Sequence, residues 1–263
     1  IFWHMASHWN EECGGGIPWM KCGNLKASIQ NELLFNLAMR LYSIDKEGSY
    51  LNIALKVWSW LKNSGLQNDV GLFNNNLEVG TCDNSRATAE WTYNQAIVLR
   101  PLVDLSIAFP DQRAYFLGQA ERIADSVLNE ENGFFWKNTK KWKYILKEKA
   151  CWHQGVSHCD TDQQVFKGTF ALNLAWLYLH VRRPEYKVWI HHNARAAWQT
   201  RTLSEREKNC KGILRRGVEV YCSQYNLHTF PLSWLPESPA PGPATLYTHV
   251  SAFGLFTAAS LIE

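Results

Sequence analysis

The chain has no long hydrophobic run and no strong excess of one charge. No apolar segment among its 263 residues approaches the length of a membrane span, and no signal peptide precedes Ile1, so we expect a soluble chain. It also lacks an initiator methionine, which is typical of a processed or truncated product. Lys and Arg total 27 against 24 Asp and Glu, and a short basic run from Lys208 to Arg216 is interpreted as a solvated loop. The sequence therefore lacks the basic surface that nucleic-acid binding requires.

The cysteines lack the paired CxxC spacing of zinc sites. They are Cys13, Cys22, Cys82, Cys151, Cys159, Cys210 and Cys222. Seven cysteines are many for a cytosolic protein, so we expect disulfides and an oxidising compartment. The odd total predicts one thiol that is free or bonded to a cysteine outside this chain.

No Pro- or Ser-rich linker divides the sequence, and 46% of its residues are hydrophobic, so residues 1–263 are predicted to form a single domain. The 13 Trp, 10 Tyr and 12 Phe residues are many for a plain helical bundle. Most are expected in the core, and the remainder could line a cleft, because flat aromatic faces stack on sugar rings.

Apolar residues recur with helical spacing along most of the chain. The expected helices are 29–41, 51–61, 92–108, 113–128, 165–179, 186–200 and 246–262. Short polar links join them in pairs, and Pro110 ends one helix while Asp111 is a candidate cap for the next. Long loops at 64–90, 130–164 and 202–245 all carry cysteines, and loops of that length are typically functional or held by disulfides. Such pairing predicts an all-α fold of the α/α-toroid type, in which loops on one face build the site. A helical solenoid would instead have a shorter and more regular repeat.

A sugar-binding cleft can also cleave a glycosidic bond where two carboxyl groups flank it, one to protonate the leaving oxygen and one to attack or to activate water. The candidates are Glu11, Glu12, Glu32, Glu78, Asp83, Glu90, Asp160 and Asp162. Each also has a structural interpretation. Glu32 could support the loop that contains Gly14, Gly15 and Gly16, called the glycine loop below. Glu90 precedes a helix start, where a carboxylate is favourable. Asp160 and Asp162 could cap the helix near Val165.

Three motifs occur in a fixed order along the chain. They are Trp9-Asn10-Glu11-Glu12-Cys13-Gly14-Gly15-Gly16-Ile17-Pro18-Trp19, Trp91-Thr92-Tyr93-Asn94-Gln95 and Phe166-Lys167-Gly168-Thr169-Phe170. Together they resemble glycoside hydrolase family 76, the α-1,6-mannanases and their fungal cell-wall relatives. The resemblance runs from Trp9 to the last helix and implies an (α/α)6 toroid, of which this chain would be the C-terminal two thirds.

Members of that family carry two adjacent catalytic aspartates, and this sequence contains no Asp-Asp dipeptide. By the family order, the pair would lie about one helix upstream of Ile1, so no catalytic residue is assigned within the chain. The resemblance implies that mannan contacts come from Gly15, Gly16, Trp19, Asn31, Trp91, Tyr93, Asn94, Gln95 and Lys167. Two departures weaken this expectation. Leu25-Lys26-Ala27 stands where the family usually has Tyr-Lys-Asn, and Ala96 stands where it has Gly.

The resemblance implies a retaining endo-α-1,6-mannanase, or a transglycosidase of the same family, that acts on yeast or fungal mannan outside the cell or in the cell wall. It implies no metal or other cofactor, because the two-carboxylate mechanism requires none. A non-catalytic mannan-binding or structural cell-wall protein is the alternative. A third interpretation, a toroidal sugar epimerase, would require histidines in the cleft as proton carriers, for which His153, His158, His191 and His192 are the candidates.

Overall fold

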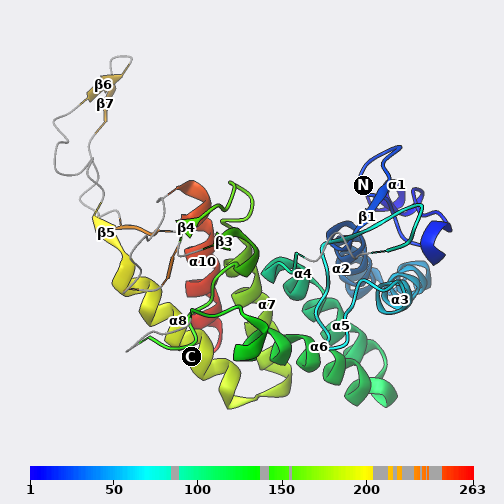
Figure 1. Ribbon diagram of the computed structural model, residues 1–263. Coiled ribbons are helices and arrows are strands. Elements are labelled where there is room, and N and C mark those ends of the chain that lie inside the picture. The colour runs from blue at the N-terminus through cyan, green and yellow to red at the C-terminus, as the bar shows by residue number, and fades with distance from the viewer. Residues whose placement is uncertain are drawn as a thin grey trace.

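The computed structural model is mainly helical, as the sequence predicts (Figure 1). It describes residues 1–83, 89–136, 142–153, 156–203, 213–215, 218–220, 228–231, 233–234, 236 and 245–263. The helices are α1 (Phe2–Ala6), α2 (Ser28–Asp45), α3 (Gly48–Asn63), α4 (Thr92–Ile97), α5 (Leu99–Ala108), α6 (Arg113–Leu128), α7 (Phe166–Val181), α8 (Pro184–Thr200) and α10 (Leu246–Leu261). None of the helices in these ranges is both long and apolar enough to cross a bilayer.

Short antiparallel strand pairs lie in the segments that connect the helices. They are β1 (Leu25–Ala27) with β2 (Asn76–Glu78), β3 (Trp152–His153) with β4 (Val156–Ser157), β5 (Thr202–Leu203) with β8 (His228–Thr229), and β6 (Ile213–Arg215) with β7 (Val218–Val220). In the first pair, Lys26 lies opposite Leu77. This pair joins the segment that follows the glycine loop to the long loop before α4, and thereby fixes the entry to α2.

The helices alternate between two rows. The pairs α2 with α3, α5 with α6 and α7 with α8 pack as helical hairpins, while α2, α5, α7 and α10 also pack in succession along one inner row. Figure 1 shows the resulting arc, which runs from α2 and α3 through α5 and α6 to α7, α8 and α10. An inner row of helices backed by an outer row is the α/α-toroid arrangement that the paired periodicity predicts.

Most expected helix boundaries lie within a few residues of the observed ones, with two differences. The predicted helix 92–108 is broken at Val98 into α4 and α5. The capping role expected for Asp111 is wrong, because Pro110–Gln112 forms a separate 3₁₀ turn and no side chain caps α6. Pro110 fits the first position of that turn because it has no N–H to donate, and α6 then begins at Arg113.

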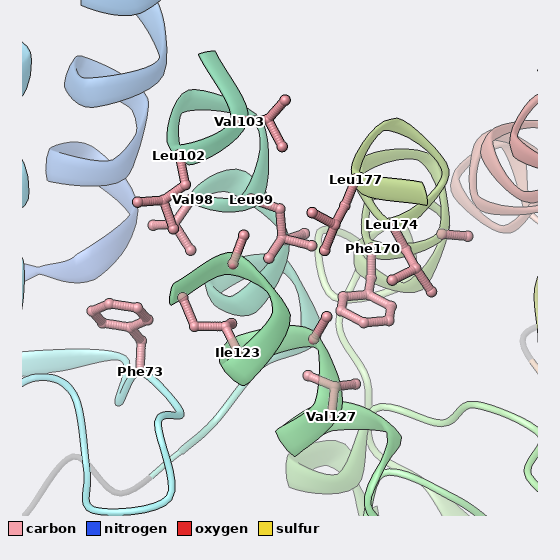
Figure 2. Close-up of a cluster of buried hydrophobic side chains, with 14 of the residues drawn as sticks. Phe73, Val98, Leu99, Leu102, Val103, Ile123, Val127, Phe170, Leu174 and Leu177 are labelled. Carbon is pink, nitrogen blue, oxygen red and sulfur yellow. The ribbon is translucent and has the colours of Figure 1, made fainter. Parts of the chain in front are cut away.

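The apolar core lies where α5, α6 and α7 meet (Figure 2). Leu99 from α5 faces Leu177 and Phe170 from α7, and these side chains are fully buried. Phe73, on the loop between α3 and α4, closes the cluster from one side (Figure 2). The loop is therefore part of the packed structure, and it positions the residues that follow it.

Helices α7 and α10 approach each other unusually closely at two glycines. A Cβ added at Gly168 would lie 2.2 Å from the carbonyl oxygen of Ser251, and one added at Gly254 would lie 2.8 Å from the carbonyl oxygen of Gly168. The Ser251 hydroxyl also accepts a hydrogen bond of 3.1 Å from the Gly168 N–H. Only glycine permits this contact, since any side chain would separate the two backbones.

The expectation of disulfides is confirmed. Cys13 pairs with Cys82 and Cys151 pairs with Cys159, while Cys22 is an exposed free thiol. Cys210 and Cys222 lie outside the described residues, as does most of the basic run from Lys208 to Arg216. Both described disulfides fasten long loops, which agrees with the expectation that such loops are held covalently.

Candidate functional site

Helices α2, α4, α7 and α10 begin at one common end of the arc, and an open groove of about 710 Å³ lies there. Residues next to or within the first turns of α2, α4, α7 and α10 line it. The lining consists of Trp19, Ile29, Gln30, Leu33, Asn75, Trp91, Tyr93, Ile97, Asp160, Asp162, Gln163, Val165, Phe166, Thr169 and Tyr247. Three predicted contact residues, Trp19, Trp91 and Tyr93, therefore meet in this groove. Its other members were not predicted as contact residues, although the Asn74-Asn75-Asn76 triplet was a signal available in the sequence.

Aromatic side chains form much of the groove wall. The rings of Tyr93 and Phe166 are in contact, with centroids 3.9 Å apart, and the Trp91 ring meets Phe166 edge to face at 5.7 Å. Trp19 and Tyr247 are 48% and 39% exposed, so both rings offer a face to a ligand. Rings that are held by their neighbours and partly open to solvent suit the apolar face of a sugar.

Tyr93 is oriented by the loop before α4. Its hydroxyl donates a 3.1 Å hydrogen bond to the side-chain oxygen of Asn75. The backbone of Asn75 is itself fixed, because its N–H bonds to the carbonyl of Ala89 and its carbonyl accepts from the N–H of Ser28. Burial, with Glu32 nearby, raises the pKa of Tyr93, so the phenol stays protonated and serves as a hydrogen-bond donor.

Asp160 and Asp162 are the groove carboxylates, but the capping role expected for them is not what the structure shows. Helix α7 begins after Val165 without a side-chain cap. Asp160 instead accepts from the backbone N–H of Gln163 at 3.0 Å and from its side-chain amide at 2.9 Å. Asp160 lies five residues before Val165, the N-cap of α7, and its carboxylate bonds within the turn 160–163 and not to the first N–H groups of the helix. Asp162 is exposed in the groove.

A buried charge pair lies behind this wall. Glu148 accepts hydrogen bonds from the backbone N–H and the hydroxyl of Thr92, at the start of α4. The fully buried Lys167 interacts electrostatically with Glu148, and its ammonium lies 4.2 Å from the ring centre of the buried Trp234. Burial raises the pKa of Glu148 and lowers the pKa of Lys167, while their mutual attraction opposes both shifts. Lys167 was predicted as a mannan contact, and the structure places it beneath the groove wall.

Glu90 lies just before α4, as expected, but its carboxylate bonds other partners than the start of that helix. Its carboxylate pairs with Lys149 and accepts from the Asn68 amide at 2.6 Å, whereas Glu148 bonds the first turn of α4. The sequence gives no signal that Glu148 bonds the start of α4, because Glu148 lies 56 residues from Thr92. The other carboxylates considered, Glu11, Glu12, Glu32, Glu78 and Asp83, do not line the groove.

Glu32 and Asn94 form a second buried polar contact, between α2 and α4. Both side chains are fully buried, and neither makes a hydrogen bond of good geometry among the described residues. Burial raises the pKa of Glu32 well above its usual range, and the adjacent Asn94 amide opposes this shift. The role considered for Glu32, support of the glycine loop, belongs to its neighbour Asn31. Burial therefore favours the protonated form of the Glu32 carboxyl, which lies on the same helix as the groove residues Gln30 and Leu33.

Asn31 and Gln95 were predicted as ligand contacts, and the structure uses both amides to hold loops. Asn31 accepts from the N–H of Ile17 at 2.8 Å and donates to the carbonyls of Ile17 and Ala27. Gln95 accepts from the N–H of Phe73 at 2.8 Å and donates back to its carbonyl at 2.9 Å. Buried loop backbone needs such partners, and these two side chains supply them.

The glycine loop encloses a lysine. A Cβ at Gly15 would lie 2.5 Å from the Trp9 ring, and one at Gly16 would lie 2.7 Å from the Trp60 ring, so the backbone approaches these two indoles. The buried ammonium of Lys26 donates to the carbonyl oxygen of Gly15 within the same loop. Gly15 and Gly16 thus lie next to tryptophans, and neither is among the groove-lining residues.

The described residues show no cluster of three or more His, Cys, Asp or Glu side chains that could hold a metal ion. His158, His191 and His192 do not line the groove, and the side chain of His153 lies outside the described part of the chain. The proton-carrying histidines that an epimerase would require are therefore not found among the described groove residues.

An arc of helical hairpins whose inner helices begin at an aromatic groove defines an α/α-toroid protein. The model of glycosyl hydrolase family 76 matches residues 1–227, and the chain belongs to this family. The GH76A α-1,6-mannanase of Salegentibacter sp. HEL1_6 has the same fold, with a TM-score of 0.69 and 22% identity over 100% of this chain and 67% of its own. A variant of that mannanase with two consecutive aspartates replaced by asparagine is described as inactive and was solved with α-1,6-mannotriose.

Two curated relatives are yeast proteins. The chain is 32% identical to the mannan endo-1,6-alpha-mannosidase DFG5 of Saccharomyces cerevisiae over 179 residues, which is 65% of this chain and 36% of that protein. It is 30% identical to the mannan endo-1,6-alpha-mannosidase DCW1 of Candida glabrata over 218 residues, 75% of this chain and 43% of that protein. The matches thus span well under half of these relatives.

Proposed function

We propose that this chain forms the mannan-binding wall of an endo-acting α-1,6-mannanase or of a transglycosidase with the same substrate. The aromatic groove at the start of the inner helices carries this proposal, because Trp19, Trp91 and Tyr93 are predicted contact residues and all three line it. Stacking faces supply affinity for pyranose rings, while Asn75, Gln163 and the phenol of Tyr93 supply polar atoms for hydroxyl groups.

The proposed chemistry is retaining hydrolysis or transfer by two aspartates. One would attack the anomeric carbon, and the other would protonate the leaving oxygen and then activate the acceptor. The inactive variant of the Salegentibacter mannanase, in which two consecutive aspartates are replaced, supports this mechanism for the family. Because the sequence has no Asp-Asp dipeptide, this part of the proposal places the pair outside the 263 residues.

A non-catalytic mannan-binding protein is the second candidate. Two observations favour it for the chain alone: the missing dipeptide, and the hydrogen bonds from Gln163 that hold Asp160, one of the two exposed groove carboxylates, in a turn. Either function places the protein outside the cell or in the cell wall. The described disulfides support that location, because such bonds persist in oxidising compartments.

The test uses linear α-1,6-mannan and the full-length protein that contains this chain. An enzyme releases new reducing ends or transfers mannosyl chains, and it loses this activity when the paired aspartates become asparagines. A binder is retained on mannan without new ends. We expect no turnover from the isolated 263 residues, and turnover by them would disprove the placement of the aspartates.

The contribution of the groove is tested with Trp19→Ala. We expect weaker retention on mannan because the exposed indole is lost. Trp3→Ala is the matched control, since Trp3 is 53% exposed against 48% for Trp19 and lies outside the groove lining. Equal retention of both variants would contradict the proposed binding surface.

A further inference from the structure

A second pocket lies on the outer row of helices. It has a volume of about 560 Å³ and lies between residues 143–144 and the first half of α8. Its lining is Lys143, Tyr144, Pro184, Glu185, Val188, Trp189 and His192. Because α8 runs antiparallel to α7, Pro184 lies at the opposite end of this hairpin from Phe166, which lines the groove (Figure 1). This pocket, called the Tyr144 pocket below, is therefore separate from the groove.

Tyr144 has a backbone conformation that a tyrosine rarely adopts. Its φ is +60°, in the left-handed region, and its side chain is 45% exposed at the pocket. A bulky L-residue is disfavoured there, and residues held in such conformations cluster at functional sites. The structure thus keeps a large aromatic ring at a position that asparagine or glycine would occupy with less strain.

Helix α8 enforces this conformation. His192 donates through Nε2 to the carbonyl of Lys143 at 2.8 Å, and the amide of Asn193 donates to the carbonyl of Tyr144 at 3.2 Å. Asn193 also accepts from the N–H of Leu146 at 2.9 Å. Bonds on both sides of Tyr144 therefore fix the backbone. The ring is then held edge to face against Phe135, at 5.7 Å and 87°.

We propose that the Tyr144 pocket is a second carbohydrate-binding site, which takes one pyranose unit of a mannan chain. The Tyr144 ring stacks on the C–H face of the sugar, and Val188, 67% exposed, forms the facing apolar wall. Lys143 and Glu185 are exposed at its edge, where they bond to ring hydroxyls. A volume of 560 Å³ lies within the range of small-molecule sites.

The choice of ligand rests on the proposed function, which supplies mannan as the substrate class. A mannan chain that occupies the groove has further mannose units outside it. When one of these units binds a second site on the same protein, the effective concentration of mannan at each site is raised. The Tyr144 pocket is thus expected to contribute more to retention on polymeric mannan than to the affinity for a short oligosaccharide.

The experiment measures two quantities, the affinity for α-1,6-mannotriose by ligand-observed NMR and the mobility in gels containing linear α-1,6-mannan. Tyr144→Ala and Val188→Arg are made in the full chain, each alone and each combined with Trp19→Ala. The combined variants lack the Trp19 contribution to binding in the groove. We expect Tyr144→Ala to weaken the remaining mannotriose binding about three- to tenfold. Tyr115→Ala is the control, because Tyr115 is 46% exposed on α6 and lies outside both lining sets.

Tyr144→Asn separates binding from folding. Asparagine tolerates the left-handed conformation, so this variant is expected to keep the melting temperature of the wild type while its retention on mannan weakens. Wild-type binding by both Tyr144→Asn and Val188→Arg would overturn the proposed site. If Trp19→Ala retains mannan normally and the Tyr144 variants do not, the groove assignment fails and the Tyr144 pocket stands.

Discussion

Replacing Lys26 with methionine is expected to destabilise the fold by about 3–5 kcal/mol. The buried ammonium donates to the side-chain oxygen of Asn10 at 2.6 Å and to the carbonyls of Glu12 and Gly15. Each charge-assisted bond contributes about 1.5–3 kcal/mol, so three give about 4.5–9. Burial lowers the pKa of Lys26, which reflects a desolvation cost that methionine does not carry and that reduces the net loss. Urea unfolding followed by tryptophan fluorescence measures the difference.

Lys56→Met is the matched control, because this lysine contacts the same loop from outside. Its ammonium lies 3.5 Å from the Glu11 carboxylate and 4.4 Å from the centre of the Trp9 ring, and its side chain is 54% exposed. An exposed ion pair and an exposed cation–π contact each contribute at most about 1 kcal/mol. Equal unfolding midpoints for the Lys26 and Lys56 variants would refute the view that an enclosed lysine holds the glycine loop.

Three further changes test the packing, a buried acid and a disulfide. Gly168→Ala should lower the free energy of unfolding by several kcal/mol, because the added Cβ would collide with the backbone of Ser251. Gly118→Ala is the control: Gly118 is an exposed helical position with open space around it, so the free energy of unfolding in the same urea assay should rise by about 0.5–1 kcal/mol. Burial raises the folded pKa of Glu32, so the contribution of this group to stability is full below the unfolded value of 4.5 and is lost as the pH rises above it. The urea midpoint of the Glu32→Gln variant should therefore fall less than that of the wild type as the pH rises above 4.5. Replacing Cys13 and Cys82 with alanine, at a separation of 69 residues, should lower the free energy of unfolding by about 4 kcal/mol, and an unchanged midpoint would contradict the loop-entropy argument.

The helical framework could be predicted because its signals are local. Helix α6 spans 113–128 as expected, since apolar residues recur every three or four positions between Pro110 and the polar turn after Leu128. The break at Val98 was not predicted, because the apolar periodicity continues through both α4 and α5. Local pattern therefore identifies the helices, and tertiary contacts determine the fine boundaries.

The candidate site was predictable in its aromatic part only. Trp19, Trp91 and Tyr93 line the groove, whereas Asn31 and Gln95 satisfy buried loop backbone. A sequence does not distinguish these two uses of a polar side chain, because the distinction depends on which loop folds over it. Family motifs also contain residues that hold the loops around a site, so a motif residue need not touch the ligand.

The common starting end of α2, α4, α7 and α10 has an electrostatic consequence. Each helix N-terminus carries a partial positive charge of about +0.5, and at α4 the Glu148 carboxylate already accepts from the first N–H, so the ends of α2, α7 and α10 supply most of the positive field at the groove. Such a field stabilises an ionised carboxylate and opposes its protonation. An aspartate that attacks an anomeric carbon is favoured at this rim, whereas the acid that must carry a proton needs shielding from it. The same scaffold would thus impose different roles on two neighbouring carboxyl groups.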